Sequence, residues 1–86
     1  MKLRIFIRGD DAEMRASKDL GERFQKEYGI QSEILDLDDR EGKEVAEVYD
    51  VTAVPSFIAA TDDGMVLGSF LGKIPAEFEL QEVLRS

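Results

Sequence analysis

Hydrophobic residues near the start of the chain occupy both faces of a predicted β-strand. Leu3, Ile5 and Ile7 recur at every second position of segment 3–8 and alternate with arginines, which is the period of a strand. Phe6 makes the opposite face apolar as well. A strand that is apolar on both faces is usually covered on both sides. We therefore expect this strand to be central.

Three later segments also have the composition of strands. Residues 30–37, 56–60 and 65–71 are rich in residues that favour strands. Segment 30–37 opens on polar residues, which indicates an edge of the sheet. Asp63-Gly64 lies between the last two segments and predicts a hairpin, because glycine supplies the positive φ of the turn.

The longest predicted helix covers residues 11–28. Asp10 or Asp11 can cap its start, and Gly29 ends it in the position where glycine is usual. A spacing of four residues assigns its buried face to Ala16, Leu20 and Phe24, with Tyr28 at the end. Gly21 costs this helix about 1 kcal/mol relative to alanine, unless a neighbour packs close to it.

Two shorter helices are predicted later in the chain. One covers residues 41–49, with Val45, Val48 and Tyr49 on one face. The other begins near Pro75, and its apolar face contains Ala76, Leu80, Val83 and Leu84. The element order is therefore βαβ followed by αββα. It predicts one α/β domain over residues 1–86, with a four-stranded mixed sheet of order 2-1-3-4 flanked by three helices, the third strand antiparallel to the first.

The composition of the chain excludes some classes of function and disfavours others. The chain has 86 residues, no cysteine, no histidine and a net charge of −8. It therefore has no thiol nucleophile, no disulfide and no histidine base or ligand. Its negative charge disfavours nucleic acid and anionic membranes as partners. Without an apolar run or a signal peptide, we expect a cytoplasmic protein.

Clustered charges are explained better by structure than by chemistry. Asp36, Asp38, Asp39 and Glu41 could gather a hard cation, but their spacing does not match a known calcium loop. We interpret them as a solvated loop and helix cap, and expect no metal or cofactor. Arg4, Arg8 and Arg15 could form a basic spot, but in so acidic a chain we expect them to pair with carboxylates.

The second half of the chain resembles the thioredoxin/glutaredoxin superfamily. The resemblance lies in Leu35-Asp36-Leu37-Asp38, Tyr49-Asp50-Val51, Ala53-Val54-Pro55-Ser56-Phe57 and then Asp63-Gly64, Phe70 and Gly72. It implies a thioredoxin-like fold in which Val54-Pro55 is the cis-proline loop that faces the redox site. Phe6 to Leu20 also resembles, more weakly, the KaiB-type clock module, which acts by binding partners.

The first half departs from the chemistry of that superfamily. The resemblance places its C-x-x-C motif on Asp11-Ala12-Glu13-Met14, so Asp11 and Met14 stand where the two cysteines would be. Thiol–disulfide exchange by this chain is impossible without them. Gly72-Lys73-Ile74-Pro75 does not match the glutathione-binding motif of glutaredoxins either.

We therefore predict a redox-inactive, non-enzymatic module that binds a protein or an extended peptide. The candidate surface contains Asp11, Ala12, Met14, Thr52, Ala53, Val54, Pro55 and Gly72. One alternative is a thiol-system component whose cysteine comes from a partner. The other is a structural subunit that associates through a sheet edge, and we expect a monomer or a weak homodimer.

Individual residues of this surface have simpler explanations. Asp11 is explained by a helix cap and Val54-Pro55 by fold architecture alone. Met14 is explained by packing at the helix start. As a binding residue, Met14 would be a soft contact for an apolar partner and would have to be exposed.

Overall fold

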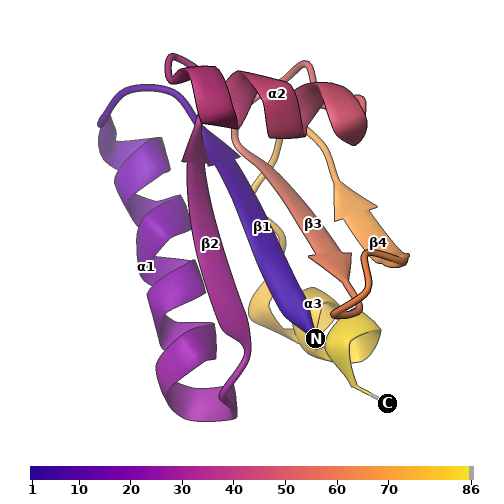
Figure 1. The fold of residues 1–86 in the computed structure, drawn as a ribbon. Coiled ribbons are helices and arrows are strands. Elements are labelled where there is room, and N and C mark those ends of the chain that lie inside the picture. The colour runs from indigo at the N-terminus through magenta and orange to yellow at the C-terminus, as the bar shows by residue number, and fades with distance from the viewer. Residues whose placement is uncertain (86) are drawn as a thin grey trace.

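The structure is a computed structural model that describes residues 1–85 as a four-stranded sheet with three helices (Figure 1). In chain order the elements are β1 (Lys2–Ile7), α1 (Ala12–Tyr28), β2 (Gln31–Asp36), α2 (Arg40–Val48), β3 (Ser56–Ala60), β4 (Val66–Phe70) and α3 (Glu77–Leu84). All seven predicted elements are confirmed. Their ends agree with the predicted ones to within two residues, and β3 has the predicted bounds.

The strand order is β2-β1-β3-β4, as predicted. β1 pairs in parallel with β2 and antiparallel with β3, and β4 pairs antiparallel with β3. β1 is thus central, and β2 and β4 form the two edges. The hairpin between β3 and β4 closes at Gly64, which has a φ of 97° and donates its N–H to the Thr61 carbonyl.

Each face of the sheet has its own core. α1 and α3 cover one face and α2 crosses the other near one end (Figure 1). The larger core contains Leu3, Ile5 and Ile7 of β1, Met14, Leu20 and Phe24 of α1, Phe57 and Ala59 of β3, and Leu80 and Leu84 of α3. The smaller core contains Phe6, Leu35, Leu37, Ala46, Val51 and Ile58. Both faces of β1 are therefore buried.

The buried face of α1 differs from the predicted one. It contains Met14, Ser17, Leu20, Gly21 and Phe24, whereas Ala16 and Tyr28 are exposed. A step of four residues turns the helix by about 40° beyond a full circle, so a strict i, i+4 row leaves the buried face within two steps. The observed face mixes steps of three and four and stays toward the sheet.

Close approaches at two glycines set the distance between helices and sheet. An added Cβ at Gly21 would lie 2.4 Å from the Ile5 Cδ1 atom. This is the close neighbour that justifies a glycine inside α1. An added Cβ at Gly42 would lie 2.0 Å from the Asp36 carbonyl oxygen, which is backbone and cannot move aside easily. α2 therefore packs on the end of β2 through a position that only glycine fits.

The two shorter helices also bury different residues from those predicted. α2 buries Gly42 and Ala46, and Val48 is 79% exposed. The small residues allow the helix to approach the sheet closely, which turns Val48 outward. In α3, Leu80 and Leu84 are buried as expected, but Ala76 precedes the helix as its cap residue and is exposed.

Four polar side chains join α1 to α3. The Arg23 guanidinium contacts the Glu77 carboxylate at 2.6 Å, and the Tyr28 hydroxyl donates to the same carboxylate at 3.0 Å. Gln81 in turn donates to the Tyr28 hydroxyl. Hydrogen bonds from Arg23 and then Tyr28 hold the pKa of Glu77 below its ordinary value.

This network predicts a pH dependence of stability that Glu77→Gln removes. Because the pKa of Glu77 is lower in the folded chain, its contribution to stability is complete above the ordinary glutamate pKa of about 4.3. The contribution is lost as the pH falls through the lowered folded value. Urea unfolding between pH 7 and pH 3 should therefore show a smaller loss of stability in acid for Glu77→Gln than for the unmodified chain.

Glu82→Gln is the matched control, since Glu82 is an exposed residue of the same helix. It should keep the pH dependence of the unmodified chain. Equal pH profiles for Glu77→Gln and the unmodified chain would show that the network does not stabilise the fold.

Candidate functional site

The sheet brings most of the predicted surface to one edge. Phe6 near the end of β1 lies opposite Ser56 at the start of β3, and Phe57 lies opposite Phe70 at the end of β4. The loop before β3, the turn after β4 and the start of α1 therefore meet at the same end of the sheet. This end is where α2 crosses (Figure 1).

The loop between α2 and β3 begins with a tight helix end. The Val51 N–H donates to the Ala46 carbonyl at 2.8 Å, and Asp50 adopts a positive φ of 61°. The peptide bond between Val54 and Pro55 is cis, as the resemblance implied. The chain thus passes from helix to strand within seven residues.

A buried serine fixes this loop to the turn after β4. The Ser56 hydroxyl donates to the Ala53 carbonyl at 2.7 Å and accepts the Gly72 N–H at 3.1 Å. The Ser56 side chain is fully buried. One hydroxyl therefore joins two segments of the predicted surface. The sequence signal for this bridge is a single serine in the otherwise apolar segment 56–60.

Five of the eight predicted residues are exposed at this end of the molecule. They are Asp11, Ala12, Thr52, Ala53 and Gly72. Val54 is half-buried and packs against both cores. Pro55 is fully buried, so its ring is part of the interior and offers no side-chain contact to a partner.

Asp11 is the N-cap of α1. Its carboxylate accepts the Met14 N–H at 2.9 Å, which satisfies one of the N–H groups that a helix start leaves open. This hydrogen bond confirms the helix cap that the sequence suggested for Asp11.

Met14 does not contribute to the surface. Its side chain is 4% exposed and belongs to the core between α1 and the sheet. The expectation that Met14 is exposed is therefore wrong. The buried face of α1 starts in the first helical turn, because steps of three and four residues from Phe24 lead through Ser17 to Met14.

A hollow of about 300 Å³ adjoins the loop at Thr52. Leu37, Ala46 and Val51, which line it, are buried and apolar, and Arg8, Lys43 and Glu47 are exposed around them. These residues come from the ends of β1 and β2 and from α2. Sequence reasoning missed this hollow, because the three segments come together only through the parallel pairing of β1 with β2.

The acidic loop after β2 is used for local structure. The Asp36 carboxylate accepts the Asp38 N–H at 2.8 Å, and Asp38 pairs with Arg8 at 3.2 Å. Arg4 pairs with Glu33 at 3.1 Å, so two of the three arginines have the carboxylate partners that we expected. Within residues 1–85 no group of three or more acidic side chains is placed to hold a metal ion.

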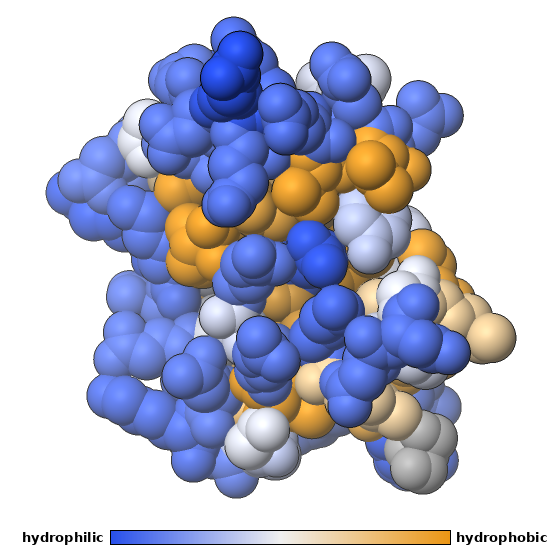
Figure 2. All heavy atoms as spheres, viewed as in Figure 1, coloured by the Kyte–Doolittle hydropathy of each residue, from blue (hydrophilic) through white to orange (hydrophobic). Residues whose placement is uncertain are grey.

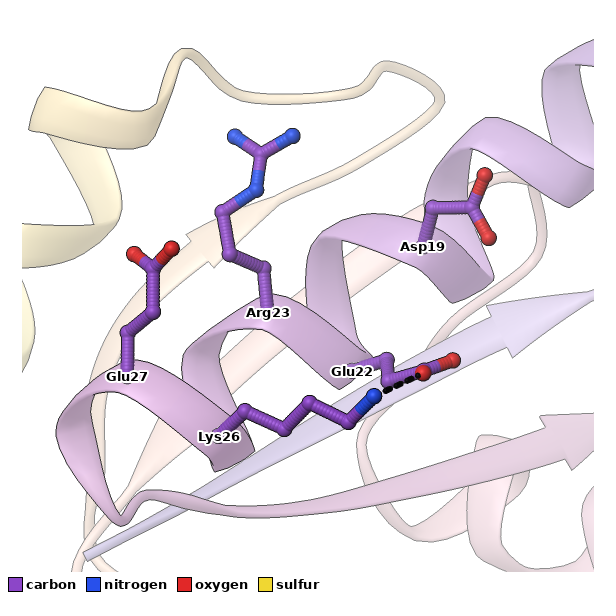
Figure 3. A pocket seen from close by; sticks show the side chains of 5 residues that line it. All are labelled: Asp19, Glu22, Arg23, Lys26 and Glu27. Atoms are coloured by element: carbon purple, nitrogen blue, oxygen red, sulfur yellow. Dashed lines mark ion pairs between the residues drawn. The ribbon is translucent and has the colours of Figure 1, made fainter.

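A second hollow, on the outer face of α1, is lined only by charged side chains (Figure 3). Its residues are Asp19, Glu22, Arg23, Lys26 and Glu27. Glu22 and Lys26 form an ion pair at 2.8 Å, and Arg23 contacts α3 through Glu77. Both cations of this hollow already have carboxylate partners within the chain, so we do not assign a binding site to it.

Several solved thioredoxins have the same architecture. The chain matches thioredoxin 1 of Thermosipho africanus with a TM-score of 0.79 at 18% identity, covering 98% of this chain and 90% of that one. The protein has a thioredoxin-like fold. The reduced thioredoxin pre-protein of Schistosoma mansoni matches with a TM-score of 0.72 at 22% identity, covering 98% of this chain and 77% of that one.

Mitochondrial thioredoxin 3 of Saccharomyces cerevisiae is also similar in structure to this thioredoxin-like chain. Its TM-score is 0.73 at 19% identity, over 96% of this chain and 74% of the yeast one. No protein-family model and no curated protein matches the sequence. At these identities the structures establish the fold and not the activity.

The thioredoxin-like chain is redox-inactive as a dithiol. It contains no cysteine. Of the two positions where the resemblance would place the cysteines, Asp11 is a helix cap and Met14 is a core side chain. Among the described residues, no helix is long and apolar enough to cross a membrane.

The bridge through Ser56 predicts a measurable loss in Ser56→Ala. The hydrogen bonds to the Ala53 carbonyl and from the Gly72 N–H would both be lost, at about 0.5–1.5 kcal/mol each. Urea unfolding should show this loss, and hydrogen exchange at the Gly72 amide should become faster. Ser69→Ala, at an exposed serine of β4, is the control and should change neither quantity.

Proposed function

We propose that this thioredoxin-like chain is a protein-binding module that holds an extended segment of a partner against the loop 52–54. The proposed surface also includes Asp11 and Ala12, at the start of α1, and Gly72, where an added Cβ would lie 3.4 Å from the Ala53 Cβ. The proposal excludes Met14 and the Pro55 ring, which are buried. It retains the expected cytoplasmic location.

The backbone of Val54 is the observation that supports this proposal. Within residues 1–85 no hydrogen bond engages the Val54 N–H or carbonyl, although the neighbouring Ala53 carbonyl is bonded to Ser56. A free donor and a free acceptor on one residue beside an exposed loop are the groups that an extended peptide pairs with when it adds to a sheet.

The loop is also held in one shape before a partner binds. Ser56 bonds it to the Gly72 turn, and the Val54 side chain packs against both cores. Because little chain has to be ordered on binding, more of the contact free energy appears as affinity. The hollow beside Thr52 offers room for one apolar side chain of the bound segment over Leu37, Ala46 and Val51.

A random peptide display library, selected for binding to the immobilised protein, tests this proposal. We expect selected peptides to shift the amide resonances of residues 52–54, Ala12 and Gly72 in isotope-labelled protein. Hydrogen exchange at the Val54 amide should become slower when such a peptide is bound, because the amide gains a partner. Shifts confined to other surfaces, or a selection that yields no peptide, would contradict the proposal.

Two alanine-to-glutamate variants distinguish binding at this surface from a general effect of added negative charge. Ala53→Glu places a carboxylate in the loop, and Ala16→Glu places the same group on an exposed position of α1 away from it. Ala53→Glu should weaken peptide binding by about ten-fold or more, the scale of a residue central to an interface. Ala16→Glu should bind as the unmodified chain does, and circular dichroism should show both variants folded.

A further inference from the structure

Asp63-Gly64 is the only place in the sequence where glycine follows aspartate. Glycine has no side chain to hinder its backbone nitrogen, so this nitrogen can approach the carboxyl carbon of the residue before it. Aspartate followed by glycine is therefore the pair most prone to isomerise to isoaspartate. The chain contains no asparagine, so deamidation produces no isoaspartate that could be confused with this reaction.

The pair lies in the turn that joins β3 to β4. Asp63 is exposed, and Gly64 has a φ of 97°. A Cβ added to Gly64 would have no atom of the described residues within 4 Å, so open space surrounds the glycine. The turn lies at the end of the two strands in Figure 1, and Figure 2 shows hydrophilic atoms exposed on this side of the molecule. Water therefore reaches the pair.

The isomerisation needs no reagent other than water. The Gly64 backbone nitrogen loses its proton and forms a bond to the Asp63 Cγ atom, while one carboxyl oxygen leaves as water, which closes a succinimide ring. Water then adds to the main-chain carbonyl carbon of Asp63 and breaks its bond to the Gly64 nitrogen. The chain afterwards runs through the former side chain, and the α-carboxylate is free. The water released in the first step balances the water consumed in the second.

Thr61 holds both groups that have to react. Its carbonyl accepts the Gly64 N–H at 3.0 Å. Its hydroxyl donates to the Asp63 carboxylate and accepts the Met65 N–H at 2.9 Å. The nitrogen and the carboxylate are thus each bound to the same residue outside the reacting pair, and the turn is fixed at Met65 as well.

Both contacts oppose ring closure. An amide that donates its N–H to a carbonyl has to give up that hydrogen bond before its nitrogen can attack. A hydrogen bond to a carboxylate favours its charged form, whereas the loss of water requires the protonated form. The hydrogen bond from the Thr61 hydroxyl is the main cause that holds the pKa of Asp63 below its ordinary value.

We propose that Asp63 is a site of spontaneous isomerisation in this chain, and that Thr61 is a positioning residue that keeps the reaction slow in the folded state. The Thr61 carbonyl restrains the attacking nitrogen, and the Thr61 hydroxyl restrains the carboxyl group. This proposal does not depend on the proposed peptide-binding function, which uses the loop 52–54.

Isomerisation lengthens the backbone of this turn by one methylene group. The Thr61 N–H donates to the Met65 carbonyl at 2.8 Å, and beside this bond Ala60 pairs with Val66 across the two strands. The added methylene group changes the geometry of both contacts, so pairing at this end of β4 should loosen. Hydrogen exchange at the Thr61 amide should therefore be faster in the isomerised chain.

Prolonged incubation of the full chain at neutral pH tests the site. Trypsin releases residues 44–73 as one peptide, which contains Asp63 and two other aspartates. Chromatography separates the isomers of this peptide, and electron-transfer fragmentation identifies which aspartate has changed. We expect isoaspartate at Asp63 alone. It should form faster by about ten-fold or more in urea, where both hydrogen bonds made by Thr61 are lost.

Two variants of Thr61 separate the role of its hydroxyl from a general effect of substitution. Thr61→Val has nearly the same shape without the hydroxyl and should isomerise faster by about ten-fold, the effect of one lost hydrogen bond to a charged group. Thr61→Ser keeps the hydroxyl and should isomerise at close to the unmodified rate. Urea unfolding of each variant is the control. Only about 10⁻³ to 10⁻⁶ of a stable domain is unfolded at any time, so a variant that remains stable reacts through its folded state.

Four results would overturn the proposal. One is an equal rate of isomerisation in the folded and the urea-unfolded chain. Another is a Thr61→Val variant that isomerises no faster than the unmodified chain. The third is a Thr61→Ser variant as fast as Thr61→Val, which would show that the hydroxyl has no part in the effect. The fourth is isoaspartate that forms first at an aspartate other than Asp63.

Discussion

Both cores of this protein are built on β1, and the burial of its two faces is the constraint on which the other elements depend. Leu3, Ile5 and Ile7 face α1 and α3, and Phe6 faces α2. Since β1 also pairs with β2 and β3, it leaves no side toward water. α1 and α3 therefore pack on one face of the sheet and α2 on the other. The candidate surface lies at the end of the sheet where β1 ends and β3 begins.

That surface is held by polar contacts that the chain makes with itself. Ser56 joins the loop to the Gly72 turn, and Asp11 caps α1. Neither contact needs a partner, which is why the loop keeps one shape while the Val54 N–H and carbonyl stay open. A binding role and a purely architectural one therefore share the same scaffold, and the difference between them lies in whether these two backbone groups are used.

The strand order and the element types could be predicted because each rests on a local pattern and on the rules for connecting strands. Side-chain burial in the helices could not be predicted as well. Ala16 and Val48 were assigned to the interior because they are apolar. Ser17 is buried instead of Ala16, with its hydroxyl bonded to the Glu13 carbonyl, and Gly42 is buried because helix and strand approach too closely there for a side chain. Within the site, Asp11 was identified correctly as a cap. Met14 was misplaced for the same reason as Ala16, since the rotation of α1 toward the sheet is decided by packing.

Asp11 and Met14, where the resemblance would place the two cysteines of a C-x-x-C motif, both have structural roles that cysteines would not fill. A cysteine at position 11 would remove the carboxylate that caps α1, at about 0.5–2 kcal/mol. A cysteine at position 14 would leave space in the core, where shortening a large apolar side chain costs a few kcal/mol. Together these changes are comparable with much of the total stability of about 5–15 kcal/mol that small domains have. Introducing a C-x-x-C motif at these positions would therefore cost stability unless the helix start and the surrounding core were redesigned with it.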